Sequence, residues 1–262
     1  MGAPAPSLWK YTSMDQTLPT HELIERLRAR LSSEGRKVQR ELDASSSSRV
    51  PGALSGPLAG ASFIAGVAGA VSLSDSPYPR PGAQPADVRR YFGGNPGAVR
   101  VSVVGQLISA ASLAWFTASV AQLAAQSGRG SGGLRAAAVS GGGLAATSLA
   151  TSALCAAALT GSRGEQDASA AALHRLMFAA GGPVHGAGFG VLVGALGLAG
   201  LRTGELPRPL AIAGLASATA GLLSPLYFVT EPAAWLIPAG RFSGLLVSGI
   251  AGARLGRRSR TS

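Results

Sequence analysis

Two ionisable side chains, His185 and Arg241, lie inside long uncharged runs of this 262-residue sequence and are the first candidates for chemistry. Each lies about eight residues, roughly 12 Å of helix, from one end of its run, so the two could meet at one depth. An arginine keeps its proton and needs an oxygen acceptor, which Gln106 and Tyr227 in other runs could supply. These four residues predict an outward-opening polar pocket for a small anionic ligand or a lipid headgroup.

A structural interpretation of the same residues stays open beside the pocket. An arginine in the outer half of a membrane span can extend its charged end to the interface while its stem stays in the apolar layer. A histidine among glycines can simply donate a hydrogen bond to a neighbouring carbonyl. A charged side chain inside a membrane raises the free energy of insertion. We therefore expect Arg241 to have either a functional or a structural role.

Motifs for enzymatic chemistry are absent from the sequence. It contains no His-Glu-x-x-His pair, no Gly-x-x-x-x-Gly-Lys loop and no Gly-x-Ser-x-Gly arrangement. The three histidines, His21, His174 and His185, are scattered, and Cys155 is the one cysteine, so no shared metal site is indicated. We expect no catalytic residue, no metal, no cofactor and no enzymatic activity.

The elements that must position these residues are six apolar runs, each interpreted as a membrane-spanning helix. The fourth run holds twenty-four uncharged residues, about 36 Å of helix, which is enough to cross a hydrocarbon core of about 30 Å. The sequence therefore predicts an all-α, polytopic transmembrane helical bundle. The six predicted spans are Gly52 to Leu73, Val101 to Ala125, Ala136 to Leu159, Phe178 to Leu201, Pro209 to Val229 and Ala233 to Ala253.

Small residues four apart form stripes along two of these spans. Such stripes allow helix backbones to approach closely, and they predict either close pairing of spans four and six or homodimerisation. Pro183 and Pro238 lie inside the same two spans, where proline removes a helix hydrogen bond and favours a kink. The predicted packing glycines are Gly182, Gly186, Gly190 and Gly194 in span four, and Gly240 and Gly244 in span six.

The composition supports a membrane protein and not a nucleic-acid-binding one. Charged residues make up 13% of the chain, against about 25% in soluble domains. The net charge of +11 comes from basic residues at the ends of apolar runs, without interleaved aromatics on one soluble face. The lipid bilayer is therefore the expected partner, and nucleic acid is not.

An N-terminal arm, residues 1–49, precedes the six-span domain, residues 50–255, and a basic tail, residues 256–262, follows it. Leu23, Ile24, Leu27 and Leu31 recur at helical spacing among arginines, which predicts an amphipathic cytoplasmic helix over about 20–43. Such a helix could contact anionic lipid, pair with a partner helix, or remain solvated. The arm lacks the apolar core of a signal peptide.

Basic residues predict the orientation. With both termini in the cytoplasm, inner segments hold sixteen Lys or Arg and outer segments six, or eight against six without the arm. Arg202 and Arg208 flank one short turn, whereas the turn at Glu231 has no basic residue. The excess of arginine over lysine, 21 to 2, indicates GC-rich coding DNA. We expect a multi-pass protein of a bacterial plasma membrane with both termini cytoplasmic.

Three local patterns resemble uncharacterised multi-span integral membrane proteins of high-GC bacteria. They are Asp87 to Asn95, Leu201 to Leu210 (LRTGELPRPL) and Trp235 to Gly244 (WLIPAGRFSG), and the likeness covers about residues 50–255. The resemblance implies a compact helical bundle and transfers no catalytic residue. The function predicted from the sequence is a structural, sensory or partner-binding membrane component. The alternative is a transporter of small anionic or amphipathic solutes that uses the pocket around His185 and Arg241.

Overall fold

The computed structural model describes residues 54–161 and 167–258. Contacts divide the chain into one unit over residues 1–48 and a second over residues 49–262, so every described residue belongs to the second unit. The described residues form helices and turns without a strand. The predicted all-helical bundle is confirmed. The predicted amphipathic helix over 20–43 lies outside the described residues, as do the rest of the N-terminal arm and residues 259–262 of the tail.

Six of the described helical segments are long and apolar enough to cross a membrane. They correspond one to one with the predicted spans, and the main differences are at the ends. The first part of the chain forms α2 (Ser55–Leu73), α3 (Pro85–Gly94), α4 (Pro96–Ala125) and α5 (Ser131–Gly161). The second part forms α6 (Asp167–Ala179), η2 (Ala180–Val184), α7 (His185–Thr203), α8 (Arg208–Leu223), η3 (Ser224–Phe228), η4 (Glu231–Trp235) and α9 (Leu236–Arg258).

Three spans are longer than their apolar runs suggested. Helix α4 begins at Pro96 and α5 at Ser131, each five residues before the predicted start. The fourth span continues through α6, η2 and α7 for 37 residues, or about 55 Å, which exceeds the thickness of a hydrocarbon core. Polar and glycine-rich residues at these ends are compatible with helix because the ends extend beyond the apolar layer.

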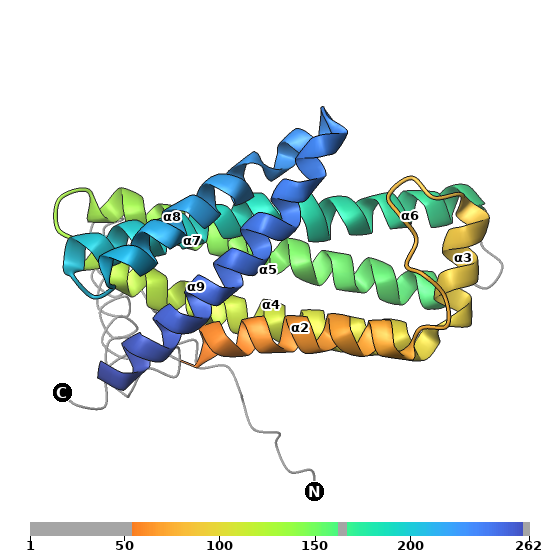
Figure 1. Cartoon of the computed structure of the whole chain (residues 1–262), viewed down its shortest axis with the longest axis horizontal. Helices are drawn as coiled ribbons and strands as arrows, with labels where there is room; N and C mark the ends of the chain where they lie inside the picture. Colours follow the sequence, from red (N-terminus) through yellow and green to blue (C-terminus); the bar gives the residue numbers. More distant parts are fainter. Residues whose placement is uncertain (1–53, 162–166, 259–262) are drawn as a thin grey trace, which may run out of the picture. The chain divides into compact units, whose positions relative to one another are not determined.

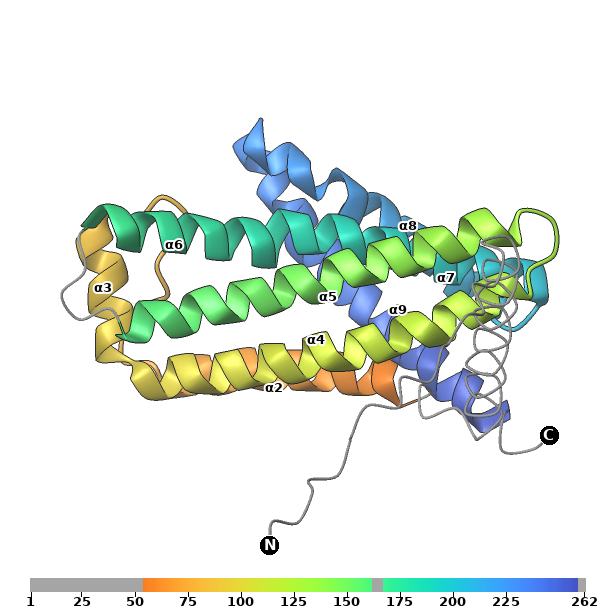
Figure 2. The same cartoon turned by 180° about the vertical axis from the view of Figure 1, so that it is seen from behind.

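The helices α2, α4, α5 and the continuous α6–α7 segment run side by side, and α9 crosses them obliquely (Figures 1 and 2). Contacts identify which turns share an end of the bundle. Arg202 Nη1 donates to the carbonyl oxygen of Arg129 at 3.4 Å, so two turns predicted as inner lie together. An ion pair joins Arg89 to Asp167, so two segments predicted as outer lie together at the opposite end.

Large apolar side chains cover the outside of the bundle. Val71 is 72% exposed, Leu154 61% and Leu246 65%, on three different spans. So many exposed large apolar side chains are unfavourable in water but suit contact with lipid chains. The interior holds mostly Ala, Gly and Ser, with Phe116, Phe189 and Leu192 among the larger buried side chains. The fold is therefore that of a membrane protein.

Glycines let α7, α8 and α9 approach backbone to backbone. A Cβ placed on Gly190 of α7 would lie 2.8 Å from the carbonyl oxygen of Ala218 in α8. Gly221 of α8 lies between two helices: its Cβ would meet the carbonyl oxygen of Gly186 at 2.7 Å, and a Cβ on Gly240 of α9 would meet its nitrogen at 2.6 Å. The stripe on span four thus packs mainly against span five.

The other predicted packing glycines divide into two groups. A Cβ on Gly244 would lie 2.7 Å from the ring of Phe189, so spans four and six do contact each other there. A Cβ on Gly194 would lie 3.2 Å from that of Ala218, whereas Gly182 has only ordinary contacts beyond 3.6 Å. The glycines of span four are equally spaced in the sequence but are not equally packed. Gly190, in the middle of the stripe, faces a neighbouring backbone, whereas Gly182, at its end, does not.

The two prolines have different local settings. Pro183 lies in the π-helical segment η2, where the span changes its hydrogen-bonding pattern. Pro238 is the third residue of α9, and an N–H at that position has no intrahelical acceptor, so proline removes no bond there.

Alanine at Gly190 tests the packing directly. We expect Gly190→Ala to destabilise the detergent-solubilised protein by about 1 to 3 kcal/mol, because the added methyl would force the backbones of α7 and α8 apart. The matched control is Gly143→Ala, since Gly143 is also helical but has nothing within 4 Å of an added Cβ. Thermal unfolding measures both variants. An equal response of the two would contradict the close approach.

Candidate functional site

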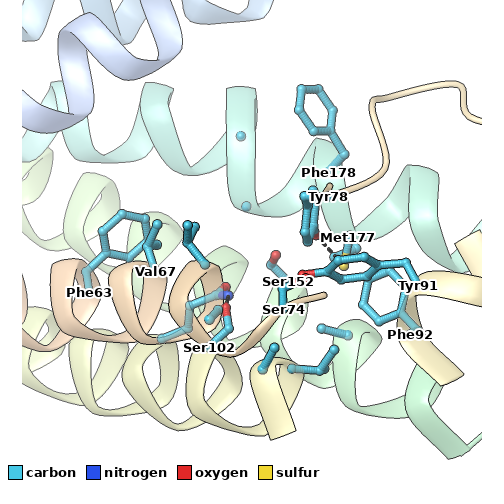
Figure 3. A pocket seen from close by; sticks show the side chains of 18 of the residues that line it. Phe63, Val67, Ser74, Tyr78, Tyr91, Phe92, Ser102, Ser152, Met177 and Phe178 are labelled. Carbon is cyan, nitrogen blue, oxygen red and sulfur yellow. Dashed lines mark hydrogen bonds between the residues drawn. The ribbon is translucent and has the colours of Figure 1, made fainter. Parts of the chain in front are cut away.

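A cavity of about 420 Å³ lies among α2, α3, α4, α5, α6, η2 and α9 and is the candidate site (Figure 3). Most of its lining is apolar, and its one charged side chain is Arg241. The polar side chains that line it besides Arg241 are Ser74, Ser76, Tyr78, Tyr91, Ser102, Gln106 and Ser152. It is formed entirely by described residues, from segments far apart in the sequence.

One end of the cavity is a cluster of aromatic rings. Tyr78 contacts Tyr91 and Phe92 edge-on, with ring centroids 5.1 and 6.1 Å apart. The Tyr78 hydroxyl donates to Met177 Sδ at 3.6 Å, a contact visible in Figure 3. Phe178 lies beside this cluster and also lines the cavity. This end can accommodate an aromatic or aliphatic group by dispersion and ring contacts.

Asn95 holds the loop that carries Tyr78. Its Oδ1 accepts from the backbone N–H of Asp75 at 2.9 Å, and its Nδ2 donates to Ser76 Oγ and to the Tyr91 carbonyl, both at 3.0 Å. The residue is buried at the junction of α3 and α4, where Asn-Pro ends one helix and begins the next. A single amide therefore fixes both the loop and the end of α3 that line the cavity.

The opposite end of the cavity contains Arg241. Its Nη2 donates to the carbonyl oxygen of Gly181, and its guanidinium carbon lies 5.0 Å from the centre of the Phe63 ring. Its Nε is buried and has no hydrogen-bond partner among the described residues. The oxygen that accepts from Arg241 is thus the backbone carbonyl of Gly181, and the Phe63 ring adds a cation–π contact to the same guanidinium.

The π-helical segment explains why this carbonyl is available. The backbone N–H of His185 donates to Ala180 O, five residues earlier, and to Gly182 O, but not to Gly181 O, its acceptor in a regular α-helix. Gly181 O therefore points to Arg241 without its usual helical partner. Glycine is also required here, since a Cβ would lie 2.3 Å from Ser152 Oγ.

Two of the four residues predicted to form a pocket line the cavity, and the other two, Tyr227 and His185, do not. Gln106 and Arg241 line the cavity, and Gln106 Nε2 donates to Ser102 Oγ at 3.0 Å. Tyr227 does not line the cavity but contacts Phe178, which does; the centroids of the two rings are 5.2 Å apart.

His185 faces a different part of the bundle. Its Nδ1 lies 2.9 Å from the carbonyl oxygen of Ala145, so Nδ1 carries a proton and donates to it. The imidazole stacks on Phe189 at 5.6 Å and does not line the cavity. This arrangement agrees with a structural role for His185, as a buried side chain whose hydrogen bond joins α7 to α5.

The aromatic end of the cavity was not among the site residues expected from the sequence. Residues 74–100 lie between the first two predicted spans, but Val88, Tyr91 and Phe92 of α3 are buried. The spacing of these three residues is that of an apolar helix face, and it was the available signal. Ser152 had no distinguishing signal in a run rich in Ser, Thr and Ala.

No group of three or more His, Cys, Asp or Glu side chains within 54–161 and 167–258 is placed to hold a metal ion. Comparison with protein-family models, with curated proteins and with solved structures finds no match to this chain. The arguments about function therefore depend on the geometry of the cavity.

Removing the Asn95 side chain tests how the aromatic end is held. We expect Asn95→Ala to speed hydrogen exchange at the Asp75 amide about tenfold, because that amide loses its acceptor and the loop opens more easily. Mass spectrometry of a peptide covering residues 71–78, in which Asp75 lies well inside, measures the rate. Gln122→Ala, an exposed change near the other end of α4, is the control. Unchanged exchange in Asn95→Ala would show that other contacts hold the loop.

Proposed function

We propose that this protein is a non-enzymatic, ligand-binding component of the bacterial plasma membrane, with a sensory or partner-binding role. The observation that carries the proposal is the cavity inside the six-span bundle, lined mainly by apolar side chains with one arginine at one end. Its volume of about 420 Å³ falls within the usual range of small-molecule sites. An amphipathic molecule matches such a lining better than water or a fully polar solute.

The position of the cavity supports access from the membrane. Val67, Val71 and Tyr78 line it and are also exposed on the outside of the bundle, so its wall is thin on this side. The exposed faces of Val67 and Val71 belong to the apolar exterior of α2. A ligand dissolved in the bilayer could therefore enter between side chains without crossing water.

A carrier of small anionic or amphipathic solutes is the second candidate. It is favoured by the interrupted helices η2 and η3, which are joined where Ser224 Oγ donates to the Pro183 carbonyl at 3.0 Å. Interrupted spans beside a cavity are common in transporters. Both functions share the binding step, and uptake into proteoliposomes separates them.

We further propose that the end of the bundle carrying the turns at 126–130 and 204–207 faces the cytoplasm. Arg129, Arg135, Arg202, Arg208 and Arg254 lie near this end. At the other end, Arg89 and Arg90 are paired with Asp167 and Asp87, which reduces their net positive charge. The resemblance to membrane proteins of high-GC bacteria agrees with this compartment.

Thiol labelling tests the orientation. In a Cys155→Ala background, we expect Ala86→Cys on α3 to react with an impermeant maleimide on intact cells, because α3 is at the proposed outer end. Ser127→Cys, in the turn after α4, should react only after the cells are permeabilised. Labelling of both positions from one face, or the reverse order, would contradict the topology.

Blocking the cavity tests ligand binding. A photoreactive, diazirine-bearing dodecanol in nanodiscs should label cavity residues such as Met177 in the unmodified protein. We expect Ala70→Trp to reduce this labelling at least fivefold, because Ala70 lines the cavity and an indole would fill it. Ala68→Trp is the matched control, since Ala68 lies on the same helix, is exposed and does not line the cavity.

Mass spectrometry of the labelled peptides gives the readout, and thermal unfolding confirms that both variants are folded. Equal labelling of Met177 in Ala70→Trp and Ala68→Trp would show that the probe reacts from the surrounding lipid. That result would reject the cavity as a binding site.

A further inference from the structure

We infer that the ligand of this cavity is an amphiphile with a single carboxylate, bound with the carboxylate at Arg241 and its apolar part at the aromatic end. The inference rests on the proposed function, because it names the class of ligand for the same site. It comes from the charge balance of the cavity and from the incomplete hydrogen bonding of the arginine that lines it.

The charge of Arg241 is not balanced by the protein. Among the described residues no carboxylate pairs with it, and its recorded contacts are the Gly181 carbonyl and the Phe63 ring. Its Nε–H is buried and unpartnered. A partly buried cation that lacks a carboxylate partner and keeps a buried, unpartnered N–H is unfavourable, and an anion would balance its charge most strongly.

The Gly181 bond and the buried Nε also argue against simple extension to the membrane surface. An arginine that only extended to the interface would place its nitrogens in water or among lipid phosphates. Here the guanidinium is held inside the bundle between η2 and α2. The chain thus keeps the charge at the cavity at a considerable energetic cost.

The remaining polar groups favour an anion as well. The lining contains no Asp or Glu, so a cationic ligand would meet Arg241 without a compensating charge. Ser152 Oγ lies against Gly181, the residue whose carbonyl oxygen accepts from Arg241. Its hydroxyl also lines the cavity and can donate a hydrogen bond in addition to those of the guanidinium. One cation and one neighbouring hydroxyl suit a monovalent carboxylate.

The apolar part of the ligand would extend from Arg241 to the aromatic rings. Figure 3 shows Phe63, which contacts Arg241, on one side of the cavity and Phe92, Tyr91 and Met177 on the other. Ser102 and Ser152 lie between them in the same view. The ligand would therefore bind with its charged group deep in the bundle and its apolar group at the ring cluster.

The experiment compares amphiphiles that differ only in their headgroup. Protein in nanodiscs at pH 8 is labelled with diazirine-bearing dodecanoate, and unlabelled dodecanoate, dodecanol, dodecylamine and dodecyl phosphate compete for the labelling of Met177. We expect dodecanoate to compete at a concentration at least tenfold lower than dodecanol, and dodecylamine to be weakest.

Variants then assign the preference to Arg241. In Arg241→Gln, the advantage of dodecanoate over dodecanol should fall to less than about threefold, with dodecanol competing as before. Arg175→Gln is the matched control, because Arg175 is exposed on α6 and does not line the cavity; it should keep the full advantage. If Arg241→Gln does not fold, the ligand series on the unmodified protein decides, together with Ser152→Ala, which should weaken dodecanoate alone.

Each outcome supports or overturns one statement. Equal competition by dodecanoate and dodecanol would overturn the anionic ligand and leave the proposed function standing. A dodecyl phosphate that competes tenfold better than dodecanoate would replace the carboxylate with a lipid-type phosphate. An unchanged preference in Arg241→Gln would overturn the role of Arg241. Failure of every amphiphile to compete would reject the proposed function itself.

Discussion

The structure depends on the requirement that every backbone polar group inside a bilayer be satisfied within the protein. Helices meet this requirement by themselves, and close helix contacts then need small side chains, which explains the abundance of Gly, Ala and Ser. The contacts at Gly190, Gly221 and Gly240 show the result, with three helix backbones meeting at one level. A chain with larger side chains at these positions could not assemble the same bundle.

The π-helical segment η2 departs from regular helix at the end of the cavity that contains its charged side chain. In η2 a backbone N–H skips one carbonyl, and the released Gly181 oxygen accepts from Arg241. The charged side chain and the irregular helix thus satisfy each other in part. The match is partial, because the Nε–H of the same guanidinium is buried without a hydrogen-bond partner among the described residues.

His185 and Arg241, which the sequence suggested as parts of one pocket, have different roles in the bundle. His185 and Arg241 lie at comparable depths of neighbouring spans, yet the histidine joins α7 to α5 and the arginine faces the cavity. Helix α3, which lies outside the spans, and α6, the first part of the fourth span, both contribute to the site, and Asn95 connects them through the loop that carries Tyr78. The cavity is consequently formed by segments from α2 to η2 together with two residues of α9, Ile237 and Arg241.

The sequence by itself determined the helical class, the six spans and the unusual position of Arg241, because long uncharged runs and a charge inside one of them are local properties. It also located the small residues that allow close packing. Only the tertiary structure decided which helix each glycine faces, that Pro183 lies in a π-helical turn, and that Phe92 and Ser152 share a cavity with Arg241. Those outcomes depend on the rotation of each helix about its axis and on its neighbours, and apolar runs of nearly uniform composition carry little information about either.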